Sequence, residues 1–152
     1  MRPICIGNAW RRLLAKGLLA RQHVALESYF LDHHPRVLQF CCGHANGATK
    51  LIQLLRTVHD SASRFDSDQV ILSLDIKNAF NTISREHLFS VLDTHHRRFE
   101  EFFSYIHSHY GHHGDLRVFL RGETHVIRSE SGVHQGDPFG STLFALGLHP
   151  IL

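Results

Sequence analysis

The sequence has few cysteines and no long apolar run. Its three cysteines, Cys5, Cys41 and Cys42, are odd in number and lack paired spacing, which argues against a disulfide framework. We therefore expect no disulfide partner and a reducing compartment inside the cell. The longest apolar run, Leu143–Leu148, is far shorter than the roughly 20 residues of a membrane-spanning helix and includes a glycine. The sequence thus predicts no membrane span.

Net charge is also small, because 16 Lys and Arg residues stand against 14 Asp and Glu residues, for a formal charge of +2. Such a balance permits contact with nucleic acid without requiring it. Hydrophobic residues make up 43% of the 152-residue chain, which is enough for an ordinary core and excludes a disordered chain. No repeat, low-complexity segment or Gly/Ser linker divides the sequence, so we predict one domain.

Histidine, by contrast, is abundant, with 15 residues. Several histidines are neighbours in the sequence, but none has Cys-x-x-Cys or His-x-x-x-His spacing within one clear element. A zinc site stays open as an alternative, although solvated histidines explain the pattern better. The residues concerned are His33, His34, His95, His96, His107, His109, His112 and His113.

The N-terminal segment is basic, since no acidic residue precedes Glu27. The pattern is compatible with an amphipathic mitochondrial transit peptide or with a helix that belongs to the domain. The first alternative implies a mitochondrial protein, and the second favours the nucleus or cytoplasm. The basic residues are Arg2, Arg11, Arg12, Lys16 and Arg21.

Periodicity and turn signals predict an α+β fold. Asn8 and Ser84 are candidate N-caps, and the Arg121–Glu123 segment is a candidate hairpin turn. The expected helices are Ala9–Phe30, a second one through Ala48–Val58, one carrying Leu88, Val91 and Leu92, an aromatic one through Phe99–Tyr110, and one from Asp137-Pro138 to Leu148; the expected strands are Val70–Leu74, Leu116–Leu120 and Thr124–Ile127.

Two segments carry candidate site residues. The apolar strand Val70–Leu74 runs directly into Asp75, which would hold one carboxylate rigidly at the edge of a sheet. Far downstream, Gln135-Gly136 stands on a loop that enters a helix, where a side-chain amide and backbone N–H groups can face an anionic ligand. A plain capped helix start is the alternative explanation for the second segment.

Together the two segments resemble the two central palm motifs of reverse transcriptases. Their residues are most similar to those of the non-LTR retrotransposon type. Asp75-x-x-x-Ala79-Phe80 is similar to the first motif and Gly132–Pro138 to the second, while Arg2-Pro3-Ile4 and Gln39-Phe40 with Gly43 resemble two fingers motifs. The resemblance implies a partial fingers and palm of a right-hand polymerase, with residues 1–65 fingers-like and residues 66–152 palm-like. It also implies an antiparallel palm sheet packed on helices, and it favours an N-terminal helix that belongs to the domain.

The resemblance implies RNA-directed DNA polymerase activity, with an RNA template, a DNA primer and deoxynucleotide triphosphates as partners. Asp75 would be the catalytic ligand of two magnesium ions, helped by the carbonyl of Ile76. Phe80 would form the floor beneath the nucleotide sugar, which is also compatible with a role as a core phenylalanine. Gln135 and Gly136 would contact the nucleotide, and Arg2 would contact its phosphates.

The family's third palm motif, which carries two aspartates on a hairpin, is not found in these 152 residues. The remaining candidate carboxylates, Asp93, Asp115 and Asp137, fall in a helix, before a hairpin and at a helix cap. We therefore expect a polymerase core cut short and inactive alone. Two alternatives stay open: an RNA-dependent RNA polymerase, which the aromatic Phe80 argues against, and a non-catalytic remnant that binds nucleic acid.

Overall fold

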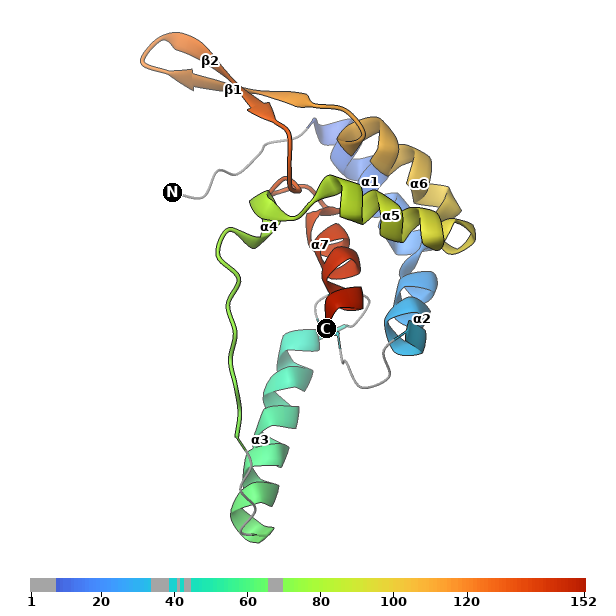
Figure 1. Ribbon diagram of the computed structural model, residues 1–152, viewed down its shortest axis with the longest axis vertical. Coiled ribbons are helices and arrows are strands. Elements are labelled where there is room, and N and C mark those ends of the chain that lie inside the picture. The colour runs from blue at the N-terminus through green and yellow to red at the C-terminus, as the bar shows by residue number, and fades with distance from the viewer. Residues whose placement is uncertain (1–7, 34–38, 41, 43–44, 66–69) are drawn as a thin grey trace.

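The computed structural model describes residues 8–33, 39–40, 42, 45–65 and 70–152. Helices dominate, and a two-stranded antiparallel sheet completes an α+β arrangement (Figure 1). The elements are α1 (Ala9–Arg21), α2 (His23–His33), α3 (Gly47–Phe65), α4 (Ala79–Thr82), α5 (Arg85–Thr94), α6 (His96–Tyr110), β1 (Gly114–Leu120), β2 (Glu123–Ser129), α7 (Gly140–Leu148) and a 3-10 turn (His149–Ile151).

The expected N-terminal helix forms, but it is divided into α1 and α2 at Gln22. Its start is as predicted, because the Asn8 side chain accepts a hydrogen bond from the Trp10 N–H at 2.9 Å. Gln22 leaves helical geometry at φ −89° and ψ 5°, so the axis changes direction there. The change of direction lets Ala15 of α1 and Phe30 of α2 both be buried in one core.

The core is built by aromatic and leucine side chains of α2, α5, α6 and α7. The predicted helix after Ser84 is confirmed, since the Ser84 hydroxyl accepts a hydrogen bond from the His87 N–H at 3.2 Å. The predicted aromatic helix is also confirmed as α6, where Phe99 and Phe102 are fully buried and their rings stack 5.2 Å apart. These helices hold α7 from two sides and thereby fix the segment that precedes it.

The prediction of a strand at Val70–Leu74 is wrong. This segment is extended but unpaired in the described part of the chain, and Val70 is 90% exposed. A strand needs a neighbour to satisfy its N–H and C=O groups, and the described residues place none beside it. Figure 1 shows α3 projecting away from the helical body and the extended segment leading up to α4.

The predicted hairpin is confirmed as β1 and β2, joined by a two-residue turn of Arg121 and Gly122. Both turn residues have positive φ, at 53° and 85°, as a type I′ hairpin turn requires. The hairpin extends away from the helices (Figure 1), and Phe119 near its tip is 75% exposed. The expectation of a sheet packed on helices is therefore not met by the described residues, because a lone protruding ribbon has no helix across its face.

Candidate functional site

Both motif segments contribute to one cavity. It has a volume of about 310 Å³ and is lined by Asp75, Ile76, Asn78, Ala79, Phe80 and Gln135. Asp75 and Ile76 are exposed at its mouth, whereas Phe80 and Gln135 are half-buried. Gly136 does not line the cavity, although it adjoins Gln135, and Arg2 lies outside the described residues.

Close backbone contacts fix the second motif against the first. The N–H of Gly132 donates to the Ile83 carbonyl at 3.0 Å, and the N–H of Val133 donates to the Phe80 carbonyl at 2.7 Å. Gly132 has φ +71°, and a Cβ there would lie 2.4 Å from the Phe80 carbonyl oxygen. Only glycine therefore permits this approach, which sets the distance between Gln135 and the Asp75 segment.

Gln135 and Gly136 occupy a turn of their own. The N–H of Asp137 donates to the His134 carbonyl at 3.2 Å, and Gly136 has φ +93°, as the third position of a type II turn requires. Helix α7 begins only at Gly140, so the expected helix start at Asp137-Pro138 is wrong. Asp137 instead accepts from the Phe139 N–H at 2.9 Å in a side-chain turn that precedes the helix.

The second carboxylate oxygen of Asp137 is engaged by two groups that the sequence did not indicate. Arg11 of α1 forms an ion pair with it at 2.6 Å, and the Tyr110 hydroxyl donates to it at 2.8 Å. The Asp137 side chain is only 4% exposed, so breaking this pair leaves a charge in a poorly solvated position. Burial together with the Asp137 carboxylate raises the pKa of the Tyr110 hydroxyl, which therefore stays protonated as a donor.

Arg85 is a further residue that sequence reasoning missed. It is buried, and its guanidinium donates to the carbonyls of Gly132 and Ser129, both at 2.9 Å, and to the Ser129 hydroxyl at 2.8 Å. Its guanidinium carbon lies 5.4 Å from the centre of the Tyr110 ring. Burial lowers the pKa of this guanidinium, which still remains charged at neutral pH. Arg85 thus ties the start of α5 to the loop that enters the second motif.

His134 adjoins this network without being part of the cavity lining. Its Nε2 atom lies 3.0 Å from the Ser129 hydroxyl, and its ring centre lies 5.2 Å from that of Tyr110. Burial, followed by the nearby charges of Arg85 and Arg11, lowers the pKa of the His134 imidazole. The neutral ring is therefore the form that fits the folded protein.

Phe80 belongs to the cavity and to the core at once. Its ring centre lies 5.3 Å from that of Phe144, and its ring edge approaches within 3.7 Å of the position that a Cβ on Gly140 would take. Phe80 also lines the cavity, together with Asn78 and Gln135. The packing leaves the ring little freedom to move away from a ligand.

Asp75 is the one carboxylate that lines this cavity among the described residues. Asp93 lies on α5 beside a different pocket, Asp115 is exposed on β1, and Asp137 is held by Arg11. Within the described part of the chain, no group of three or more His, Cys, Asp or Glu side chains is placed to bind a metal ion. One carboxylate with the neighbouring Ile76 carbonyl suits a single magnesium ion that keeps water and phosphate ligands, and does not suit a pair of ions.

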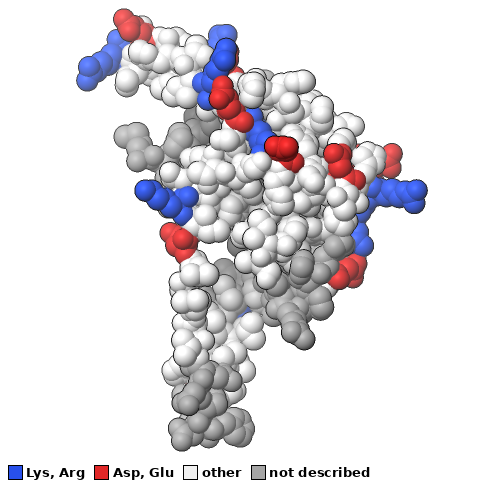
Figure 2. All heavy atoms as spheres, viewed as in Figure 1, with Lys and Arg blue, Asp and Glu red and all other residues white. Residues whose placement is uncertain are grey.

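Charge is mixed on the surface near the site. In Figure 2, basic and acidic side chains are interspersed over the visible face, and the described residues there form no continuous basic stripe. No described helix is long and apolar enough to cross a membrane. The surface is therefore compatible with contact to a phosphate backbone through separate basic side chains.

The chain matches one family model along residues 1–152, and the description of that family is "Reverse transcriptase (RNA-dependent DNA polymerase)". Comparisons with curated proteins and with solved structures gave no match.

Proposed function

The chain belongs to the reverse transcriptase family, and on that premise we propose that it forms the nucleotide-binding part of an RNA-directed DNA polymerase of the non-LTR retrotransposon type. The observation that carries this proposal is the single cavity to which Asp75, Phe80 and Gln135 contribute from two distant segments. In this assignment residues 1–65 correspond to fingers and residues 66–152 to palm. The partners are an RNA template, a DNA primer and deoxynucleotide triphosphates, in the nucleus or cytoplasm.

The proposed reaction is in-line attack of a primer 3′-hydroxyl on the α-phosphate of the incoming nucleotide. Asp75 and Ile76 both line the cavity, and the Asp75 carboxylate together with the Ile76 carbonyl would hold a magnesium ion that accompanies the triphosphate. Magnesium, when bound, neutralises charge that builds up on the phosphate oxygens. A two-metal mechanism would require carboxylates in addition to Asp75, which is the one carboxylate that lines this cavity among the described residues.

Phe80 and Gln135 give the cavity its proposed specificity. The Phe80 ring is held by Phe144, so it cannot easily withdraw from a nucleotide sugar, and a ring at that position would clash with a 2′-hydroxyl. Gln135 reaches the same cavity from a turn that Gly136 shapes and offers an amide to the nucleotide. These roles favour a DNA-making enzyme over an RNA-making one.

We further propose that the 152-residue chain alone binds nucleic acid but does not extend a primer, because its cavity holds one carboxylate. Primer extension on an RNA template with magnesium tests this proposal. We expect no product from the chain alone, and product from the chain fused to a hairpin with the family's two aspartates. Asp75→Asn in the fusion should abolish that product, since it removes the charge but keeps the size of the side chain.

Templated synthesis by the 152-residue chain alone would contradict the proposed inactivity. Undiminished synthesis by the Asp75→Asn fusion would reject the metal-binding role. Nucleic-acid binding that weakens with added salt, with no synthesis by either protein, would instead favour the alternative of a non-catalytic binding remnant.

A further inference from the structure

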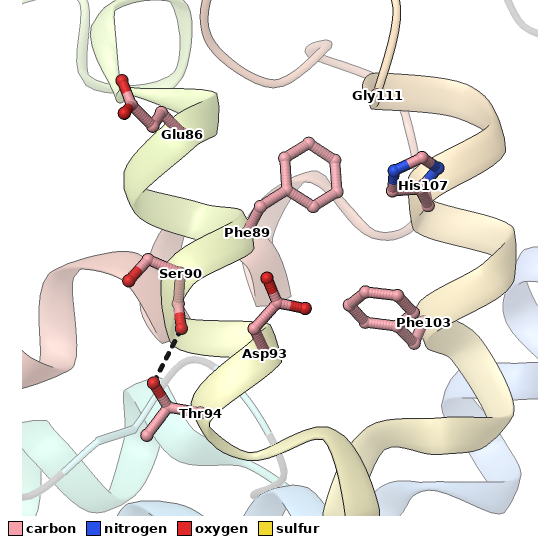
Figure 3. A pocket seen from close by; sticks show the side chains of 8 residues that line it. All are labelled: Glu86, Phe89, Ser90, Asp93, Thr94, Phe103, His107 and Gly111. Carbon is pink, nitrogen blue, oxygen red and sulfur yellow. Dashed lines mark hydrogen bonds between the residues drawn. The ribbon is translucent and has the colours of Figure 1, made fainter.

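A second, larger pocket lies between α5 and α6. It has a volume of about 620 Å³ and shares no residue with the Asp75 cavity. Figure 3 shows its two walls, with side chains of α5 on one side and side chains of α6 on the other. The lining residues are Glu86, Phe89, Ser90, Asp93, Thr94, Phe103, His107 and Gly111. We call this pocket the α5–α6 groove.

Aromatic rings form much of the groove wall. Phe89 and Phe103 are half-buried, so each keeps part of its ring open to the groove. The ring of His107 lies near both, with its centre 5.4 Å from that of Phe89 and 6.1 Å from that of Phe103. Such rings present electron-rich faces that attract cations as well as apolar groups.

Two carboxylates accompany these rings. In Figure 3, Asp93 directs its carboxylate into the space between Phe89 and Phe103, whereas Glu86, two helical turns away on α5, lines the groove but directs its carboxylate away from these rings. The ion pairs found among the described residues involve other carboxylates, namely those of Asp32, Asp60, Glu101, Glu123 and Asp137. The groove therefore carries negative charge that the described part of the chain does not neutralise with an ion pair.

Two arginines lie beyond one end of the groove. A neighbouring hollow shares Asp93 and Thr94 with it and is also lined by Arg97 and Arg98. Arg98 is paired with Asp32 at 3.0 Å, so its charge is directed elsewhere. At the other end, Gly111 lines the groove without a side chain, so Asp93 is the carboxylate that Figure 3 shows directed into the groove.

We propose that the α5–α6 groove binds an arginine side chain from a basic segment of a partner protein. A planar guanidinium can stack on the Phe103 or Phe89 ring while it donates two parallel hydrogen bonds to the Asp93 carboxylate. Lysine matches this combination less well, because its ammonium is compact and strongly hydrated. Nucleic acid is disfavoured, because a phosphate in the groove would face the carboxylate of Asp93. The proposal goes beyond the polymerase function and does not depend on it.

The test measures binding of a fluorescein-labelled peptide, with three arginines separated by glycines, to the 152-residue chain by fluorescence anisotropy at low salt. Matched peptides carry lysine or neutral citrulline in place of arginine. Asp93→Asn removes the central charge at constant size, and Phe103→Leu removes an aromatic face at similar volume. Glu100→Gln is the control, because Glu100 is an exposed carboxylate of α6 outside the groove lining.

We expect Asp93→Asn and Phe103→Leu each to weaken binding of the arginine peptide about fivefold, which corresponds to about 1 kcal/mol. Glu100→Gln should change affinity less than twofold, and the citrulline peptide should not bind. Asp93→Asn alters an exposed side chain, so it decides the question even if Phe103→Leu perturbs folding. The proposal would be overturned if the Asp93→Asn and Glu100→Gln variants bound the arginine peptide with equal affinity. It would also be overturned if the lysine or citrulline peptide bound the wild-type chain as tightly as the arginine peptide. NMR shifts of Ser90 and Thr94 on addition of an RNA oligonucleotide, rather than the arginine peptide, would also overturn it.

Discussion

Replacing Gly132 with alanine tests how the two motifs are held together. The new Cβ would lie 2.4 Å from the Phe80 carbonyl oxygen and 2.5 Å from the Asn81 carbonyl, and both atoms belong to backbone that cannot rotate away. The Gly132 loop must therefore move out, which stretches the hydrogen bonds from Gly132 to Ile83 and from Val133 to Phe80. Gln135 would move with the loop and leave the Asp75 cavity.

Two effects of Gly132→Ala destabilise the folded protein, and a third effect partly offsets them. A positive φ costs alanine about 1–2 kcal/mol relative to glycine. Weakening two buried backbone hydrogen bonds adds about 1–3 kcal/mol for each group left unsatisfied. Alanine also restricts the unfolded chain, which offsets about 0.4–1 kcal/mol. We expect Gly132→Ala to lower the free energy of unfolding by about 4 kcal/mol.

Two other glycines serve to separate the cost of positive φ from the cost of the close backbone contact. Gly122 has φ +85° but no atom within 4 Å of a built Cβ, so Gly122→Ala should show the backbone cost alone, about 1 kcal/mol. Gly17 lies in α1 with open space around it, so Gly17→Ala should stabilise the chain by about 0.5–1 kcal/mol. Urea unfolding followed by circular dichroism is the suitable assay, because the single tryptophan, Trp10, is 79% exposed and reports poorly on the core. If Gly132→Ala unfolds at the same urea concentration as Gly122→Ala, the close approach of the motifs is refuted.

Three further predictions concern the same network. Arg85→Leu should lower the free energy of unfolding by about 2–4 kcal/mol, since it removes the guanidinium donors to the carbonyls of Ser129 and Gly132; urea midpoints unchanged from wild type would contradict this. His134 has a lowered pKa in the folded protein, so the unfolded chain binds more protons below about pH 6.5 and stability should fall as the pH drops through that range. His134→Gln should flatten that dependence in unfolding measured across pH, and an unaltered profile would exclude this histidine as its source. Phe80→Val in the fusion protein should raise the ratio of kcat/KM for ribonucleotides over deoxynucleotides, whereas an unchanged ratio with a lowered Tm would leave Phe80 as a core residue only.

Local signals predicted much of the helical body correctly. Asn8 and Ser84 cap helices as expected, because capping depends on a few neighbouring residues. The hairpin was also predictable, since Gly122 and the flanking apolar residues act locally. The division at Gln22 was not predicted, because the apolar positions on both sides of it continue to favour helix and only tertiary packing sets the break.

Long-range contacts were beyond the reach of the sequence patterns. Arg85 looks like an ordinary polar residue in a first helical turn, and its partners lie in a loop far along the chain. The ion pair between Arg11 and Asp137 likewise joins residues that are far apart in the sequence. For the Val70–Leu74 segment, the sequence pattern predicted a strand that does not form. Strand propensity without a neighbouring strand does not make a sheet.

The central claim is that Asp75, Phe80 and Gln135 form one nucleotide site, and photo-crosslinking of an azido-deoxynucleotide triphosphate to the 152-residue chain tests it most directly. Mass spectrometry should locate the crosslink on peptides that contain Phe80 or Gln135. The crosslink should require magnesium, decrease with Asp75→Asn, and persist with Asp93→Asn in the separate α5–α6 groove. Crosslinks confined to other peptides, or unaffected by Asp75→Asn, would contradict the assignment of this cavity as the nucleotide site.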